Sequence, residues 1–369
     1  MTAKNALLLP SGLYDLLPPE ASRESDAVAR LLASFASFGY AQVSPPLLEF
    51  ETSLLSGRGS ALSPQTFRVM DPLSQAMMGF RADITLQVAR IARSRLGGEP
   101  RPLRLCYAGP ILQSTPEALR NERQLTQAGI ELIGSDSLHA DAEVMIVAAQ
   151  TIKALGIEDI SIDLNLPGLL GELCPEALTD SGLRKQIKDA ILRKDSAAIA
   201  SLPIANNTLL ASLAESAGPA DKTIATLKKL KLLQADKLKA VAERVQQSCP
   251  YASLTVDPIE YRGFDYHEGI SFSIFAGGLR HELGRGGRYK VEKDSATGVT
   301  LYVTHLLRLL PVRQEEKRVL VPEDTGLDVI AKLHAENWIT LYALTKEHRK
   351  EAQHLHCSYI LEKGKIQNT

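Results

Sequence analysis

The sequence predicts an α+β fold with an antiparallel sheet, flanking helices, a helical insertion and a small C-terminal α/β domain. Before residue 166, strand-like segments outnumber helical ones, and their connections are often too short for helical crossovers, which favours antiparallel pairing. Residues 166–247 are rich in Ala, Leu and Lys and read as helices, whereas strand patterns resume afterwards. We therefore expect a core formed by 1–165 and 248–315, a helical insertion at 166–247 and a small domain at 316–369.

The composition is that of an ordinary soluble globular protein. Of the 369 residues, 44% are hydrophobic and 23% are charged, and the formal net charge is −1. This balance does not favour a nucleic-acid partner. No stretch reaches the ~18 apolar residues of a membrane span, so a cytoplasmic protein is expected. The four cysteines lack metal-ligand spacing, so we expect buried thiols and neither a metal nor a cofactor.

The elements of the first half follow from the spacing of apolar residues. A helix is expected from Ala21 to Phe38, because Leu31 and Phe35 recur at helical spacing. A strand-like run from Tyr40 follows, and its two prolines should lie at a sheet edge or a subunit contact. Further strands are expected at 65–71, 77–81, 103–107, 125–133 and 160–164, and helices at 85–96 and 141–155.

The insertion carries a run of lysines at 222, 228, 229, 231, 237 and 239. Such a run is compatible with a nucleic-acid surface, but Asp221, Asp236 and Glu243 are interleaved with it and no aromatic residue is present for stacking. A solvated helix face is therefore favoured. Beyond the insertion, strands are expected at 253–256, 270–275, 279–283, 318–321, 340–343 and 359–361, and helices at 299–310 and 327–336.

The first polar cluster with possible chemistry is Arg81-Ala-Asp83-Ile-Thr85 at a strand-to-helix junction. A carboxylate and a hydroxyl there could bind an ammonium through Asp83 and Thr85, and Arg81 could bind an anion. The alternative is an ordinary helix start, with Asp83 as the capping acid and Arg81 as a surface charge.

The second cluster is Gln127-Ala-Gly-Ile-Glu131 within an apolar run. In a strand, Gln127, Gly129 and Glu131 face the same side. A carboxylate inside an apolar sheet needs a partner, and a ligand cation or an imidazole N–H would supply one. The alternative is an acid on the surface of an edge strand.

The third cluster joins Tyr261-Arg-Gly-Phe-Asp-Tyr-His267 with Glu282-Leu-Gly-Arg-Gly-Gly-Arg-Tyr289. Its glycines allow the backbone to approach a ligand, and Arg285 and Arg288 favour an anion. A plain hairpin explains the same glycines. The run fits neither the dinucleotide-binding fingerprint nor the P-loop pattern.

Taken in order, these clusters resemble those of histidyl-tRNA synthetase-like proteins of the class II aminoacyl-tRNA synthetase fold, over about residues 10–310. Leu9-Pro-Ser-Gly-Leu-Tyr-Asp-Leu-Leu-Pro18 is similar to the family's opening, and Gly39–Pro46 to its dimer-forming first motif. Arg262-Gly-Phe-Asp-Tyr266 and Gly286-Gly-Arg-Tyr289 resemble its two histidine-specific signatures.

The resemblance implies a histidine-binding pocket. It assigns the amino group to Asp83, Thr85 and Gln127, the carboxylate to Arg262, and the ring to Glu131 with Tyr266. Tyr289 and His267 would complete the pocket. His267 departs from the family, which usually has a second tyrosine there, so the contact to the imidazole differs at that position.

Two departures bear on activity. The family's second motif has a Phe-Arg-x-Glu pattern that binds ATP, and here Gln113 stands for the arginine and Thr115 for the acid. The third motif ends in Gly-x-Glu-Arg, and here Thr304-His305 takes the place of the last two residues. Losing both phosphate-binding arginines predicts an inactive adenylation site.

A catalytically inactive chain of this kind resembles the regulatory subunits of ATP phosphoribosyltransferase. That resemblance implies a short catalytic subunit as partner in a hetero-octamer, self-association as a dimer, and a role in the first step of histidine biosynthesis. It also implies allosteric feedback inhibition by histidine, with no membrane or nucleic-acid partner. The alternatives are another synthetase paralogue that senses an amino acid, or an active histidyl-tRNA synthetase.

Overall fold

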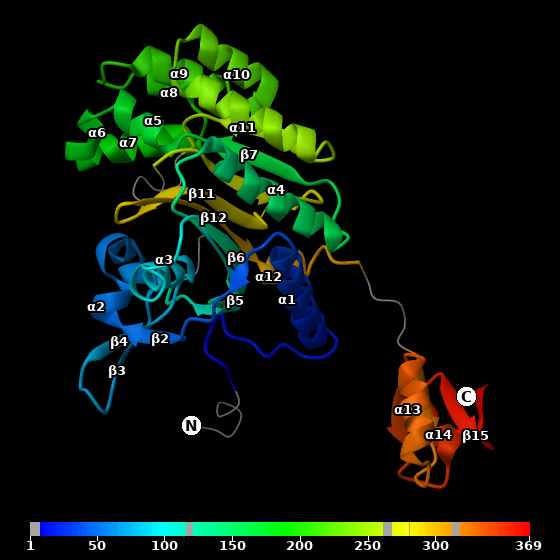
Figure 1. Ribbon diagram of the computed structural model, residues 1–369. Coiled ribbons are helices and arrows are strands. Elements are labelled where there is room, and N and C mark those ends of the chain that lie inside the picture. Colours follow the sequence, from blue (N-terminus) through cyan, green and yellow to red (C-terminus); the bar gives the residue numbers. More distant parts are fainter. Residues whose placement is uncertain (1–7, 116–120, 261–267, 280, 312–316) are drawn as a thin grey trace. The chain divides into compact units, whose positions relative to one another are not determined.

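The computed structural model describes residues 8–115, 121–260, 268–279, 281–311 and 317–369. The chain divides into two compact units, Met1–Leu310 and Pro311–Thr369. Each unit has its own sheet and its own buried core (Figure 1). Within the described ranges, no helix is long and apolar enough to cross a membrane.

A mixed sheet is the centre of the first unit, and its described strands follow the order β1-β5-β6-β12-β11-β10-β7-β9-β8. Neighbours run antiparallel except for the parallel pairs β1–β5 and β7–β9. β1 lies at the edge, as the prolines that follow it predict. The strands are β1 (Ala41–Gln42), β5 (Leu103–Leu112), β6 (Gln124–Ile133), β7 (Ser161–Asn165), β8 (Gly218–Pro219), β9 (Ser253–Asp257), β10 (Ser271–Phe275), β11 (Gly284–Val291) and β12 (Asp294–Tyr302).

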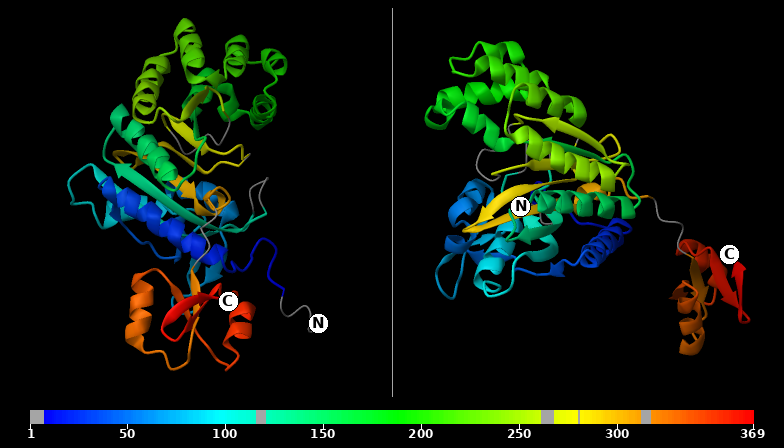
Figure 2. Two further views of the ribbon diagram at one scale, coloured as in Figure 1. Left: turned by 90° about the vertical axis from the view of Figure 1, so that its right-hand side faces the viewer. Right: turned by 45° about the horizontal axis from the view of Figure 1, so that its top comes forward.

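Helices α1 (Glu20–Ser37) and α4 (Leu138–Ala154) cover one face of this sheet (Figure 2). Leu31 and Phe35 of α1 are fully buried there, in one core with Ile130 and Leu132 of β6. Because side chains alternate along a strand, the odd-numbered residues of β6 point to the opposite face. That second face carries Gln127 and Glu131, two of the residues predicted for the site.

The second face is covered by helix α3 (Thr85–Ser94), which buries Val88 and Ala92 against Leu105 and Tyr107 of β5. A three-stranded antiparallel sheet lies beside α3, with β4 between β2 and β3. Its elements and their neighbours are β2 (Leu48–Phe50), β3 (Arg68–Met70), β4 (Met77–Phe80), α2 (Glu51–Leu54) and the 3₁₀ helix η2 (Gly57–Gln65).

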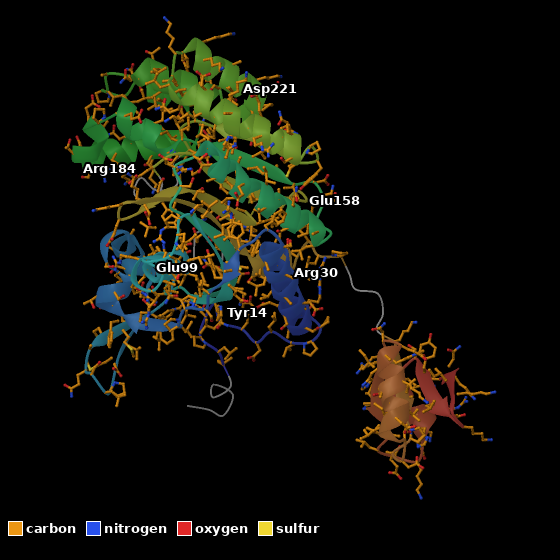
Figure 3. The ribbon with its side chains drawn as sticks, viewed as in Figure 1. Tyr14, Arg30, Glu99, Glu158, Arg184 and Asp221 are labelled. Atoms are coloured by element: carbon orange, nitrogen blue, oxygen red, sulfur yellow. The ribbon has the colours of Figure 1, made fainter. Side chains whose placement is uncertain are left out.

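The segment between β7 and β9 is mainly helical, as its composition predicts, and also contains the two-residue strand β8. The lysines of its run are all exposed, and Lys228 and Lys239 pair with the interleaved acids Asp236 and Glu243. Asp221 likewise lies on the outer surface (Figure 3). The helices are α5 (Pro167–Leu173), α6 (Glu176–Thr179), α7 (Ser181–Leu192), α8 (Ser196–Ala200), α9 (Asn207–Glu215), α10 (Ala220–Lys229) and α11 (Gln234–Ser248).

The second unit is a small α/β sheet in the order β14-β13-β15-β16. β13 pairs in parallel with both β14 and β15, and β16 is antiparallel. Val319 and Val321 are fully buried, with Trp338 packed edge-to-face on Tyr359. The elements are β13 (Arg318–Val321), α13 (Leu327–Ala335), β14 (Ile339–Tyr342), α14 (His348–His354), β15 (Tyr359–Glu362) and β16 (Lys365–Asn368).

Two sequence-based expectations were wrong. The strand expected at 279–283 begins only at Gly284, because Gly277 and Gly278 turn the chain with positive φ before it re-enters the sheet. The helix expected at 299–310 is instead the end of β12 followed by the short α12 (Val303–Leu306). An apolar run that is buried on both faces looks the same in a strand and a helix. The four cysteines are free and buried, as expected.

Candidate functional site

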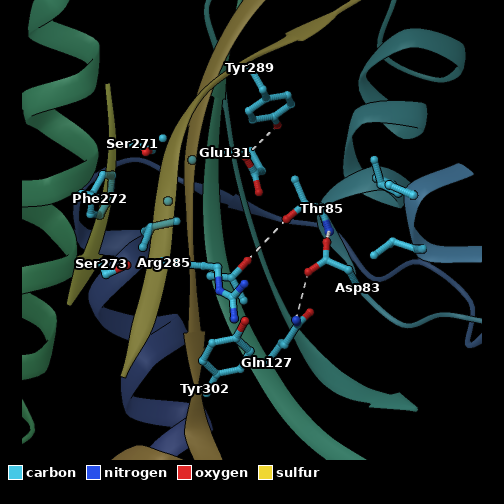
Figure 4. A pocket seen from close by; sticks show the side chains of 18 of the residues that line it. Asp83, Thr85, Gln127, Glu131, Ser271, Phe272, Ser273, Arg285, Tyr289 and Tyr302 are labelled. Carbon is cyan, nitrogen blue, oxygen red and sulfur yellow. Dashed lines mark hydrogen bonds between the residues drawn. The ribbon is translucent and has the colours of Figure 1, made fainter. Parts of the chain in front are cut away.

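A cavity of about 370 Å³ opens on the second face of the large sheet, a size typical of small-molecule sites (Figure 4). Strands β6, β10, β11 and β12 form its floor, and the start of α3 forms one side. Its described lining includes six of the residues predicted from sequence: Asp83, Thr85, Gln127, Glu131, Arg285 and Tyr289.

The carboxylate of Asp83 is oriented by two hydrogen bonds. One oxygen accepts from the backbone N–H of Thr85 at 2.8 Å, and the other accepts from Nε2 of Gln127 at 3.0 Å. The amide oxygen of Gln127 accepts in turn from the backbone N–H of Ile84 at 3.1 Å. Gln127 thus joins β6 to the first turn of α3 and holds the Asp83 carboxylate at the cavity wall.

Three hydroxyl groups form a second polar row. The hydroxyl of Tyr107 lies 3.1 Å from Oγ1 of Thr85 and 2.8 Å from Oγ1 of Thr300. Tyr107 of β5 pairs in register with Gly129 of β6, where an added Cβ would lie only 2.5 Å from the tyrosine oxygen. The glycine therefore makes room for the ring of Tyr107 beneath the cavity.

Glu131 is the fully buried acid of the cavity, with 1% of its surface exposed. Its carboxylate accepts hydrogen bonds from the hydroxyls of Tyr289 at 2.7 Å and Tyr107 at 3.3 Å. Burial raises the pKa of Glu131 to about 8, although the Tyr289 bond acts in the opposite direction. A neutral carboxyl group near pH 7 can donate a proton to a basic ligand group, or ionise beside a cation.

The cationic side of the cavity is Arg285. Its Nε donates to the carboxylate of Glu282 at 2.7 Å, and its guanidinium lies 5.7 Å from the ring centre of Tyr302. Held in this way, Arg285 faces the cavity from β11, opposite Glu131 of β6 and Asp83, which lies just before α3 (Figure 4).

Comparison with known proteins decides the family. A family model described as histidyl-tRNA synthetase matches residues 12–306. An ATP phosphoribosyltransferase regulatory subunit of Paramagnetospirillum magneticum is 46% identical, over 97% of this chain and 96% of its own. The protein of the same name from Rhodospirillum centenum is 43% identical, over 98% and 96%. This chain belongs to the family of ATP phosphoribosyltransferase regulatory subunits.

Solved structures agree with the fold of this family. A protein described as an ATP phosphoribosyltransferase regulatory subunit/histidyl-tRNA synthetase from Bacillus halodurans superimposes with a TM-score of 0.78 at 18% identity, covering 94% of this chain and 96% of its own. Histidyl-tRNA synthetase from Nostoc gives 0.77 at 18% identity, covering 96% and 91%. The class II synthetase fold expected from the sequence is therefore confirmed.

Two of the arginines predicted as anion ligands form hydrogen bonds and ion pairs with other parts of the chain. Arg81 is buried and donates to the carbonyl oxygens of Pro110 and Pro45, each at 2.8 Å. Arg288 pairs with the buried Asp141 at 2.9 Å. Neither is among the described residues that line the cavity. Arg262, Tyr266 and His267 lie outside the described residues.

The four positions that the sequence analysis expects to differ from the synthetase motifs are all described. Gln113 lines the cavity and is buried, whereas Thr115 is exposed. Oγ1 of Thr304 lies 3.4 Å from the backbone nitrogen of Thr126, and Nδ1 of the buried His305 lies 2.6 Å from the carbonyl oxygen of Glu282.

Sequence reasoning missed several residues of the lining, including Asn165, Glu260, Ser273, Gly298, Thr300 and Tyr302. Those of β12 were hidden because this segment was read in part as a helix. In the structure, Gly298, Thr300 and Tyr302 lie on the face of β12 that lines the cavity, and Val299 and Leu301 lie on the face that packs on the core.

Proposed function

We propose that this chain is the non-catalytic regulatory subunit of an ATP phosphoribosyltransferase, acts with a short catalytic subunit in the first step of histidine biosynthesis, and binds histidine as its feedback inhibitor. The names of its full-length relatives support the regulatory role. The assignment of histidine as the ligand rests on one observation. Two hydrogen-bond acceptors line the same cavity: Asp83, oriented to accept from an ammonium, and the buried Glu131.

Free histidine matches this lining group by group. Its ammonium would bind Asp83, Thr85 and Gln127, and its imidazole would meet Glu131 beside the Tyr289 hydroxyl. The resemblance assigns its carboxylate to Arg262, and Arg285 is the cation that the described lining offers on the opposite side. Both ends of the ligand would find a charge-assisted hydrogen bond, which is the stronger kind.

The same cavity is unsuited to activating histidine with ATP. Where the synthetase motifs place two phosphate-binding arginines, this chain has the neutral Gln113 and the buried His305. Stabilising a pentavalent phosphorus centre requires preorganised positive charge. We therefore expect no histidine-dependent ATP–pyrophosphate exchange by the purified chain. Exchange clearly above that of a protein-free blank would contradict this part of the proposal.

Assembly with the catalytic chain is the decisive test of the regulatory role. We expect the two chains to co-purify as a hetero-octamer, with α1 and the segment up to Pro46 forming a two-fold contact between copies of this chain. Transfer of phosphoribosyl groups to ATP should require both chains and should fall when histidine is added. A catalytic chain whose activity does not change when this chain is added would refute the proposal, and heat-unfolded chain serves as the control.

A further inference from the structure

The helical insertion contacts the cavity through the ends of two strands. β7 and β9 run parallel, with Asn165 opposite Asp257 at their last paired position. Asn165 lines the cavity, as do Pro167 at the start of α5 and Glu260 beyond β9. The chain leaves this wall at α5 and returns to it after α11, so the insertion begins and ends at the site.

Side-chain hydrogen bonds join the two strand ends. Nδ2 of Asn165 donates to one carboxylate oxygen of Asp163 at 3.0 Å, and Oγ1 of Thr255 donates to the other at 2.5 Å. Residues 255 and 257 share a face of β9, as do 163 and 165 on β7. The position of Asp257 is therefore linked to that of Asn165 in the cavity wall.

Asp257 is held by a lysine of the insertion. Lys194 forms an ion pair with its Oδ2, and the other oxygen, Oδ1, is buried with no hydrogen-bond partner within the described part of the chain. The side chain of Asp257 is only 12% exposed, so losing the ammonium would leave an almost buried carboxylate unpaired. An unpaired buried charge is strongly unfavourable and moves toward water.

The backbone fixes where this lysine stands. Lys194 lies between α7 and α8 with φ of +53°, a conformation that non-glycine residues rarely adopt. Its N–H donates to the carbonyl of Ile191 at 3.0 Å, and the next residue, Asp195, caps α8 by accepting from the N–H of Ala198 at 2.9 Å. This turn presents the ammonium of Lys194 to the end of β9.

We propose that Lys194 is a positioning residue for the cavity: through Asp257 it fixes the strand ends that carry Asn165 and Glu260, and the insertion thereby sets the affinity of the site. This inference rests on the proposed histidine site. The insertion would then take part in ligand binding, although its sequence predicts only a solvated helical segment.

The test compares variants of the purified full chain by calorimetric titration with histidine. Lys194→Asn removes the charge but tolerates positive φ, and we expect it to raise the dissociation constant about 3- to 30-fold. Lys194→Arg should stay close to wild type because the ion pair is kept. Lys228→Asn, which removes the exposed pair with Asp236 in the same insertion, is the matched control and should have no effect.

A double-mutant cycle and hydrogen exchange make the outcome decisive. In an Asp257→Asn background, Lys194→Asn should cause no further loss, because no buried charge remains to be left unpaired. Amide exchange of residues 161–166 in the free chain should be faster in Lys194→Asn than in wild type. Wild-type binding together with wild-type exchange in that variant would overturn the inference.

Failure of the histidine proposal gives a different result. In that case the wild-type chain itself binds no histidine, and the amide exchange of residues 161–166 decides alone: faster exchange in Lys194→Asn supports the positioning role, and unchanged exchange rejects it.

Discussion

Replacing Glu131 with glutamine is expected to weaken histidine binding by about 10- to 100-fold. The carboxyl group is fully buried, and the hydroxyls of Tyr289 and Tyr107 hold it in place in the cavity lining. Glutamine keeps the shape of the side chain, but it can neither ionise beside an imidazolium nor give a proton to an imidazole. The loss should therefore reflect chemistry rather than packing.

The pH dependence of binding gives this variant a second signature. The free imidazole ring titrates near pH ~6.5, and the pKa of Glu131 is raised to about 8. We expect the bound imidazole ring and the Glu131 carboxyl group to share one proton. The two free partners together carry one proton only between these two pKa values. Below about pH 6.5 binding must release a proton, and above about pH 8 it must take one up. Affinity should then fall about tenfold per pH unit on either side.

These effects are measured by titrating wild type and Glu131→Gln with histidine from about pH 5.5 to about pH 9, the extremes lying about one unit beyond each expected pKa. In the variant the fall caused by Glu131 above about pH 8 should disappear. Glu143→Gln is the control, because Glu143 pairs with Arg104 and Tyr40 away from the cavity lining. Equal affinities of wild type and Glu131→Gln at pH 7 would remove Glu131 from the site.

Gly298→Ala should have the second large effect, on folding as well as binding. A Cβ at this position would lie 1.7 Å from Oε2 of Glu131 and 2.8 Å from the carbonyl oxygen of Ile130. Because β6 and β12 are both inside the sheet, neither can move away freely. Such overpacking should lower the free energy of unfolding by about 1–3 kcal/mol. It should also weaken histidine binding at least as much as Glu131→Gln, since the carboxyl group must leave its place.

Denaturant unfolding and histidine titration test this prediction together. Gly168→Ala is the matched control: Gly168 lies in α5, and an added Cβ would meet no atom within 4 Å beyond its chain neighbours and its own helix backbone. The stability of this variant should be unchanged or slightly higher. In a Glu131→Ala background, Gly298→Ala should cost less stability, because the main clash is gone. A Gly298→Ala chain with wild-type stability and affinity would contradict the packing around Glu131.

The predictable part of the site lies on β6. Its alternation is regular, so the shared face of Gln127 and Glu131 followed from the period of a strand, and the structure confirms it. The roles of Arg81 and Arg288 could not be predicted in this way. Their partners, such as the Pro45 carbonyl and Asp141, are far away in sequence, and only the folded sheet brings them together.

The β12 segment shows a second limit of prediction from the sequence. Residues 299–303 are apolar or small on both faces, because one face packs on the core and the other borders the cavity. Strand and helix have the same hydrophobic pattern in such a run. Reading residues 299–310 as a helix hid Thr300 and Tyr302, although the preceding glycine-rich segment of the site was recognised. The lining residues of β6 were therefore predicted from the sequence, and those of the neighbouring strand β12 were missed.

The amide of Gln127 has a consequence for the energetics of recognition. It holds the Asp83 carboxylate and the first turn of α3 together before any ligand arrives. Side chains that are already ordered lose little rotamer freedom on binding, a cost of about 0.5–1.5 kcal/mol for each one that must otherwise be immobilised. The affinities of amines of different size should therefore differ only through the contacts that each amine makes with this wall. The loss of side-chain entropy in the protein is small and nearly the same for each amine.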